Sequence, residues 1–246
     1  MKVNRLRIIA GPNGSGKTTL YFFLKNKILT GIWLNADEIL DQFKRKGFIE
    51  YALLGFRPSQ NAFNKFCNKK SSITFINTFN LNSSIKNLHF AEFSITYTNK
   101  SLSNELAAFL TNFFRYFLLS INSSITTETV LSHQSKLDFV QQAKRKKYKT
   151  YLYFIATSSP EINIRRIKGR MYKGGHSVPA GKIKSRFLKS INILGKSISI
   201  FDRVYIFDNS GNDIQLIASY ENAQLEKIYT TKIPLWLNFL LNKKDE

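Results

Sequence analysis

The apolar residues of this chain begin with a short strand-like run and continue into helical spacing. Residues 6–10 form a β-branched apolar run that predicts a buried strand, and residues 17–28 have the apolar spacing of a helix. A second strand is expected at 31–35, followed by a helix at 37–46 that stops at Gly47. This strand–helix–strand beginning indicates a parallel α/β sheet.

The middle of the chain differs from the first part in composition and in hydrophobic pattern. Residues 59–103 are rich in Asn, Ser, Thr, Phe and Lys, and their periodicity is weak. Alternating positions over 73–77 predict an edge strand within this segment. Because the segment is too small for a core of its own, we expect an insertion in a single domain spanning residues 1–246. An apolar-faced helix is expected at 102–119.

The second half of the chain again alternates between strand-like and helix-like patterns. The pattern predicts, in order, a strand at 121–130, a helix at 135–147, a strand at 150–156, helices at 160–171 and 179–194, a strand at 203–208, and a strand pair with a closing helix over 213–240. The expected fold class is α/β, with a mainly parallel central sheet.

The turn between the first strand and the first helix has the sequence of a phosphate loop. It fits G-x-x-x-x-G-K-S/T as Gly11-Pro12-Asn13-Gly14-Ser15-Gly16-Lys17-Thr18, with Thr19 next. Backbone N–H groups of such a loop cradle phosphate oxygens, and the helix N-terminus adds its positive end. Lys17 is expected to reach the β- and γ-phosphates, and the Thr18 hydroxyl to hold Mg²⁺. ATP and Mg²⁺ are therefore the expected ligands.

Two carboxylates lie at or just after the ends of predicted strands, at the edge of the sheet where ligands bind. Asp37, in the sequence Asn35-Ala36-Asp37-Glu38, could accept a proton from an attacking hydroxyl. The same residue could instead cap the helix that begins here, so both interpretations stay open. Glu128, near the end of the strand at 121–130, could hold substrate hydroxyls or a metal-bound water.

An arginine-rich helix follows the strand at 150–156. Arg166 and Arg170 are four residues apart and share one helix face, which suits a lid over 160–180 that closes on a triphosphate. Gly174-Gly175 is a plausible hinge for that lid. The alternative is a solvated basic helix, but the presence of a phosphate loop favours the lid.

The net charge of +21, from 37 Lys+Arg and 16 Asp+Glu, indicates an anionic partner such as a nucleotide, a phosphorylated metabolite, an acidic protein or nucleic acid. Nucleic acid is the less favoured of these. The single cysteine, Cys67, cannot form an intrachain disulfide, which fits a reducing cytoplasm. The apolar run at 8–10 is too short for a signal sequence, and no run approaches the roughly 18 apolar residues of a membrane span. We therefore expect a cytoplasmic protein without a membrane partner.

Five motifs occur together in the order seen in the zeta toxin family of P-loop kinases. They are the phosphate loop, Asn35-Ala36-Asp37-Glu38, Glu128-Thr129-Val130-Leu131-Ser132, Gly174-Gly175-His176-Ser177-Val178-Pro179 and Asp208-Asn209-Ser210. The matching blocks cover about 1–50 and 120–210, and they resemble the compact chromosomal branch of the family most. The resemblance implies a three-layer P-loop kinase fold with an Arg-rich lid and an inserted segment.

The resemblance also implies an activity. Zeta toxins transfer the ATP γ-phosphate to the sugar 3′-hydroxyl of UDP-N-acetylglucosamine, and an antitoxin protein usually restrains them. By motif position, Asp37 resembles the general base, and Glu128 and Thr129 resemble the residues that contact the substrate.

Further roles follow from the later motifs. Arg170 is the first choice for the lid arginine, with Arg166 and Arg186 as partners, and Asn209 is expected near the adenine. Two other functions stay open on the sequence. One is a polynucleotide or RNA kinase, which the charge and the basic cluster at 144–149 would suit. The other is a non-catalytic ATP-binding regulatory module.

Overall fold

The computed structural model describes residues 3–99, 101–172 and 178–241, and the chain divides into two compact units. The first unit contains Met1–Thr30 and Thr126–Glu246, and the second contains Gly31–Ile125. The second unit is thus inserted in sequence between the phosphate-loop segment and the rest of the first unit.

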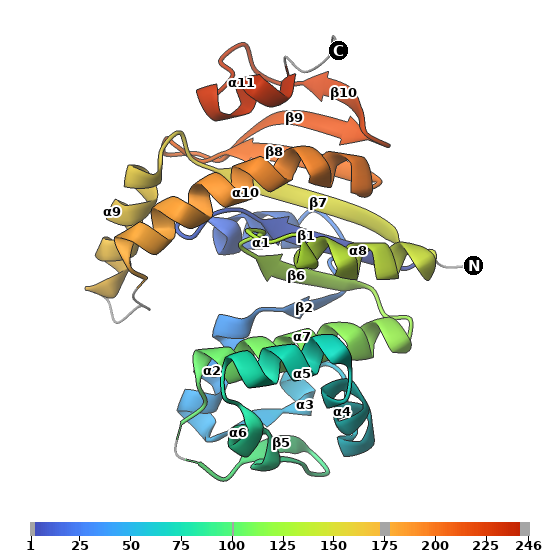
Figure 1. The fold of residues 1–246 in the computed structure, drawn as a ribbon. Coiled ribbons are helices and arrows are strands. Elements are labelled where there is room, and N and C mark those ends of the chain that lie inside the picture. Colours follow the sequence, from blue (N-terminus) through green and yellow to red (C-terminus); the bar gives the residue numbers. More distant parts are fainter. Residues whose placement is uncertain (1–2, 100, 173–177, 242–246) are drawn as a thin grey trace. The chain divides into compact units, whose positions relative to one another are not determined.

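The first unit is built on a sheet. Its strands are β1 (Arg5–Ala10), β6 (Ile125–Thr129), β7 (Lys149–Ala156), β8 (Arg203–Asp208), β9 (Gln215–Glu221) and β10 (Gln224–Ile228). They lie in the order β10-β9-β8-β7-β1-β6 (Figure 1). Strands β1, β7 and β8 are parallel, with Ile8 beside Leu152 and Leu152 beside Val204, whereas β9 and β10 complete the edge in antiparallel pairing. In β1 every residue after Arg5 is buried, as expected of a central parallel strand.

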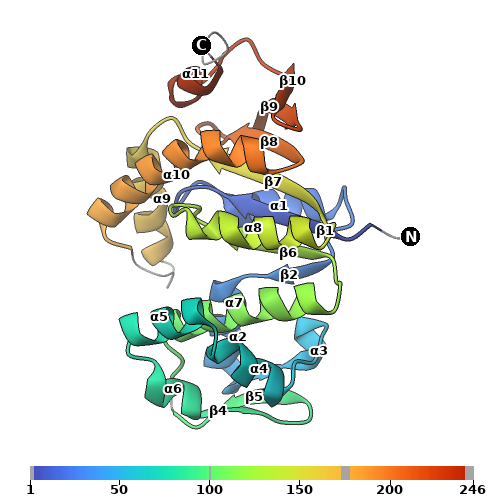
Figure 2. The same ribbon diagram turned by 45° about the vertical axis from the view of Figure 1, so that its right-hand side comes forward.

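Helices cover both faces of this sheet. They are α1 (Lys17–Lys25), α8 (Ser135–Arg145), α9 (Pro160–Met171), α10 (Ala180–Ile200) and α11 (Leu235–Leu241). Connections between parallel strands are right-handed, which places α8 and α10 on one face, as Figures 1 and 2 show, with α1 on the other. The buried apolar residues of α10 recur every three or four positions and form its core-facing stripe: Ile183, Phe187, Ile191, Leu194 and Ile198. The α/β class with a mainly parallel sheet, predicted from the sequence, is confirmed.

The second unit combines helices with a small sheet. Its elements are β2 (Ile32–Leu34), α2 (Ala36–Lys46), β3 (Phe48–Glu50), α3 (Tyr51–Leu54), α4 (Gln60–Cys67), α5 (Lys70–Thr78), α6 (Asn82–Lys86), β4 (Leu88–Phe90), β5 (Ser94–Tyr97) and α7 (Asn104–Ser120). Strand β5 pairs antiparallel with β3 and with β4.

Phenylalanines from α4 and α7 form the core of the second unit. Phe63, Phe109, Phe113 and Phe114 are each at most 1% exposed, and the rings of Phe63 and Phe113 meet edge to face with centroids 5.1 Å apart. Part of the predicted insertion at 59–103 therefore packs against α7. The second unit starts earlier than that insertion, at Gly31, and also includes α2. The division into one domain with an insertion stays a prediction.

The edge strand predicted at 73–77 is wrong, because these residues belong to α5. Apolar and polar residues alternate from Ile73 to Phe75, but Ser72 and Ile76 are four positions apart, as on one face of a helix. Ser72 and Ile76 are buried in the structure, whereas Ile73 is 46% exposed. Burial of one helical face outweighs the local alternation, which is weak evidence in a window of five residues.

Some predicted boundaries also shift. The strand expected at 121–130 begins only at Ile125, because α7 continues to Ser120 and Asn122 adopts a φ of 55° in the turn that follows. The helix expected at 179–194 continues to Ile200. Across the described ranges, no helix combines the length and apolar character needed to cross a membrane.

Candidate active site

The phosphate loop joins β1 to α1 in the first unit, and its backbone requires glycine. Gly11 has φ 149° and Gly16 has φ 100°, in the region that L side chains rarely adopt. A Cβ on Gly11 would lie 1.9 Å from the Ile155 carbonyl oxygen, and one on Gly16 would lie 2.3 Å from Asn209 Nδ2. The backbone of β7 at Gly11 and the Asn209 side chain at Gly16 therefore leave no room for a Cβ, and only glycine fits.

Lys17 and Thr18, at the start of α1, meet the carboxylate of Glu128 on β6. Lys17 Nζ donates to the Pro12 carbonyl oxygen at 3.0 Å and lies 3.6 Å from Glu128 Oε1. The Thr18 hydroxyl donates to Glu128 Oε2 at 3.0 Å. Lys17 is only 6% exposed, so water screens its charge weakly. The ammonium and hydroxyl of two adjacent residues thus meet a carboxylate from a distant part of the sequence beside the loop.

These groups fit a triphosphate and a magnesium ion. Helix α1 follows Gly16 directly and has no acidic residue in its own first turn, so its positive N-terminal end follows the loop directly. The Ser15 hydroxyl is buried within the loop and has no hydrogen-bond partner among the described residues. Thr18 and Glu128 supply the oxygen ligands that Mg²⁺ prefers. Lys17, Thr18 and Glu128 would therefore hold the phosphates and the ion.

Two buried asparagines outside the motif support the loop. Asn209 Nδ2 donates to the Ser15 carbonyl oxygen at 2.8 Å. Asn163, on α9, accepts a hydrogen bond from the Thr157 hydroxyl at 2.6 Å, and its backbone packs against Gly14. Asn163 belongs to no motif and was not predicted, although it lies four residues before the buried Ile167 and so on the core-facing side of α9. Proximity of Asn209 to an adenine stays a prediction, since its contact in the structure is with the loop.

Arg186, from α10, reaches the tip of the loop. Its Nη1 donates to Asn13 Oδ1 at 3.1 Å, although the two residues are 173 positions apart in sequence. The side chain is half-buried, and burial lowers the pKa of its guanidinium. Arginine keeps its charge at neutral pH even so. The structure therefore brings to the loop the arginine that the sequence analysis named only as a partner of Arg170.

The other two arginines have different surroundings. Arg166 Nη2 donates to the Gly211 carbonyl oxygen at 3.3 Å, and Nη1 is buried with no hydrogen-bond partner among the described residues. Arg170, in the last turn of α9, is exposed. The predicted hinge, Gly174-Gly175, lies outside the described residues, as do His176 and Ser177. The lid and the catalytic roles of Arg166 and Arg170 stay predictions.

Asp37 belongs to the second unit, in the first turn of α2. The helix is capped by Asn35, whose Oδ1 accepts a hydrogen bond from the Asp37 backbone N–H at 2.8 Å. The interpretation of Asp37 as the capping residue is therefore wrong, because the buried asparagine two positions earlier already fills that role. The Asp37 carboxylate is exposed and is not used as the cap. Its function as a general base stays a prediction.

The remaining predicted residues lie close to the loop in sequence or in space. The Thr129 carbonyl oxygen accepts a hydrogen bond from Gly11 N–H at 3.3 Å, and the Thr129 hydroxyl accepts one from Leu131 N–H at 3.3 Å. Thr129 therefore shapes the turn after β6, where Leu131 has a φ of 51°. Thr19 is exposed on α1. Substrate binding by Thr129 and cofactor binding by Thr19 stay predictions.

The chain is similar to proteins of known structure, but it matches neither a family model nor a curated sequence. A chain of the AvrRxo1-ORF1:ORF2 complex, solved with ATP, aligns with 91% of this chain at 16% identity and a TM-score of 0.51. The alignment covers 60% of that chain, so the present chain spans less than two thirds of its length.

Two further structures align less closely. One comes from the PezAT chromosomal toxin–antitoxin system of Streptococcus pneumoniae, with 15% identity over 98% of this chain and 83% of that chain and a TM-score of 0.49. The other is a kinase of Chloroflexus aurantiacus described as putative, with 15% identity over 76% and 78% of the two chains and a TM-score of 0.43. At these identities a likeness speaks to fold alone: the chain has the α/β fold, with a mainly parallel sheet and a phosphate loop between β1 and α1, that its motifs predicted.

Proposed function

We propose that this chain is an ATP-dependent kinase that transfers the γ-phosphate to a hydroxyl of a nucleotide-sugar, with UDP-N-acetylglucosamine as the expected acceptor. The observation that carries the proposal is the contact of Glu128 with both Lys17 and Thr18 beside the phosphate loop. ATP as the donor is supported by the AvrRxo1-ORF1:ORF2 complex, which was solved with ATP and contains a chain of similar fold. The acceptor rests on the motif resemblance.

The phosphate loop would bind the triphosphate by charge and by hydrogen bonds. Two unit charges 4 Å apart near a protein surface attract by about 4 kcal/mol, so Lys17 and Arg186 can each stabilise the γ-phosphate substantially. The Pro12 carbonyl and the Glu128 carboxylate hold the Lys17 ammonium from two sides. A bound Mg²⁺ would supply charge neutralisation between the phosphates and fix their orientation.

Proton removal from the acceptor is assigned to Asp37. Its carboxylate would take the proton of the sugar hydroxyl while the hydroxyl oxygen forms a bond to the γ-phosphorus. The bond between that phosphorus and the β-phosphate oxygen breaks, and ADP leaves. Arg170 would act on the charge of the transferring phosphoryl group.

The test is a phosphoryl-transfer assay with Mg²⁺-ATP and a panel of UDP-sugars, read by mass spectrometry. The proposal expects one UDP-sugar to gain a single phosphate with the wild-type chain and none with Asp37→Ala. Lys17→Ala should lose both ATP binding and transfer, because its ammonium contacts the phosphates in every step. ADP release without a phosphorylated sugar would indicate that the acceptor is another molecule, and RNA and DNA ends would be tested next. Absence of ADP under all conditions would favour a non-catalytic nucleotide-binding module.

One observation bears on the polynucleotide alternative. Lys144, the first residue of the basic cluster at 144–149, donates to the Ile200 carbonyl oxygen at 2.8 Å and lies 2.9 Å from Asp202 Oδ1. Its charge therefore stabilises the first unit and is less available to a nucleic-acid backbone. The motif resemblance, in contrast, supports an antitoxin protein as the partner.

A further inference from the structure

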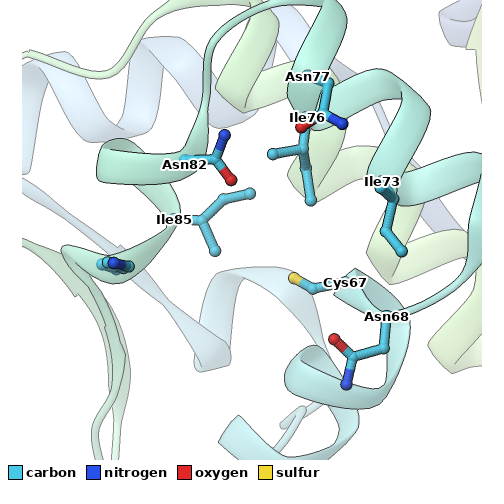
Figure 3. Close-up of a pocket in the computed structure, with 8 residues that line it drawn as sticks. Cys67, Asn68, Ile73, Ile76, Asn77, Asn82 and Ile85 are labelled. Atoms are coloured by element: carbon cyan, nitrogen blue, oxygen red, sulfur yellow. The ribbon is translucent and has the colours of Figure 1, made fainter.

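A small hollow in the second unit lies among α4, α5 and α6, away from any residue assigned above. Its volume is about 230 Å³. Ile76 and Ile85 lie on opposite sides of it, with Cys67 beside them (Figure 3). Ile76 is 7% exposed, and Ile85 and Cys67 are partly buried, so these three side chains form an apolar interior.

The rim of this hollow is polar. It is formed by the carboxamides of Asn68, Asn77 and Asn82 and by the ammonium of Lys86, all of them exposed. Within the part of the chain that the structure describes, none of these four side chains makes a hydrogen bond or an ion pair. Each carboxamide offers two donors and an acceptor. The rim can therefore hydrogen-bond a ligand that has both kinds of group along one edge.

The charge around the hollow favours an anion. Between positions 51 and 125 the sequence has seven Lys or Arg residues and only two carboxylates, Glu92 and Glu105. Neither carboxylate lines the hollow, whereas Lys86 does. A phosphate or another compact anion held near Lys86 would thus meet an ammonium with no lining carboxylate to compete for it.

We propose that this hollow binds a nucleoside phosphate, with the base between Ile76 and Ile85 and the phosphate at Lys86. Proteins hold an unstacked base between apolar side chains and read its edge by hydrogen bonds, and asparagine carboxamides match the paired donor and acceptor of such an edge. The volume is below the roughly 300–1,000 Å³ of sites that enclose a drug-sized ligand. The hollow therefore encloses the base and leaves the ribose and the phosphate outside.

Other small ligands use the hollow less completely. An alkyl chain would contact the isoleucines but would leave three carboxamides without partners. A free sugar would satisfy the carboxamides but would place hydroxyls against an apolar interior. A flat base with a polar edge would contact the apolar interior and also hydrogen-bond the carboxamides of the rim. This proposal does not depend on the kinase activity proposed for the first unit.

Cys67 provides a direct reporter, because it is the only cysteine of the chain and it lines the hollow. Burial raises the pKa of its thiol to about 11, so alkylation by iodoacetamide is followed at alkaline pH, where more thiolate is present. We expect AMP or UMP to slow the alkylation of Cys67 at least fivefold at saturation, while inorganic phosphate alone has no effect. Protection by UMP and not AMP would identify the ligand as uridine-based, and the reverse as adenine-based.

Variants separate this site from the phosphate loop. Asn82→Ala and Lys86→Ala should each raise the nucleotide concentration for half-protection at least tenfold. Lys70→Ala removes the same charge from an exposed position of α5 that does not line the hollow, and it should change nothing. Lys17→Ala should also leave protection intact. The proposal is overturned if neither nucleotide slows the alkylation of Cys67. It is also overturned if nucleotide protects Cys67 in Asn82→Ala and Lys86→Ala as well as in the wild type, or if Lys17→Ala abolishes this protection.

Discussion

Replacing Asn209 by alanine should destabilise the first unit even when no nucleotide is present. The side chain is 9% exposed, and its Nδ2 donates to the Ser15 carbonyl oxygen at 2.8 Å. Removing the donor leaves a buried carbonyl without that partner, which costs about 1–3 kcal/mol. For a chain of this size each kcal/mol lowers the melting temperature by about 2–4 °C, so a loss of about 2 kcal/mol corresponds to roughly 4–8 °C.

The assay is thermal and urea unfolding of ligand-free protein, followed by circular dichroism. Asn209→Asp is the informative second variant, because it keeps the volume but replaces the N–H donors by a carboxylate. We expect it to be at least as destabilising as Asn209→Ala. Asn212→Ala, at an exposed position nearby, is the matched control and should stay within about 0.5 kcal/mol of the wild type. If Asn209→Ala is as stable as this control and only ATP affinity falls, then Asn209 acts on the nucleotide and not on the loop, and the reasoning fails.

Three further results are expected. Asp37→Ala should abolish phosphoryl transfer while ATP still binds by calorimetry; near-normal turnover would exclude Asp37 as the base. Arg170→Ala should lower kcat more than ATP affinity, because a lid arginine acts on the transition state, and a pure loss of affinity would contradict that role. Asp202→Asn should make the free energy of unfolding depend less steeply on pH at acid pH. Burial acts to raise the pKa of Asp202, but hydrogen bonds from Thr150 and Lys144 outweigh it and leave the pKa below its usual value. A carboxyl whose folded pKa is depressed stabilises the protein above its unfolded pKa of about 3.9, and this contribution is lost as the pH falls through the folded pKa. An unchanged acid limb in urea titrations of Asp202→Asn would refute this.

The parts of the site that the sequence predicts are those encoded by neighbouring residues. The phosphate loop is contiguous, its glycines are required by local backbone angles, and the strand before it is a plain apolar run. Glu128 was expected at the ligand edge because it lies near the end of a predicted strand, but its pairing with Thr18, 110 positions away, needs the tertiary structure. The contact of Arg186 with Asn13 spans 173 positions and has no local signal.

Errors arose where two local patterns competed. At 73–77, partial alternation suggested a strand, yet helical spacing places Ser72 and Ile76 on the buried face of α5. At the start of α2, Asn35 and Asp37 are both suitable caps, and which of them caps depends on where the backbone becomes helical. Asn163 is a polar residue on a buried helix face, and its partner Thr157 lies in the preceding turn, so attention to buried-face polar residues would have found it.

The way the phosphate loop is supported has a consequence for the protein during its synthesis. The loop lies near the N-terminus, whereas Asn209, which bonds it, follows Ser15 by 194 residues. At about 5–20 residues per second, a ribosome adds Asn209 roughly 10–40 s after Ser15. A nascent chain would therefore carry an unsupported loop until Asn209 has been added, and a fragment released before that residue would lack a complete nucleotide site. The nucleotide site of this chain would thus be completed by a residue made long after the loop itself.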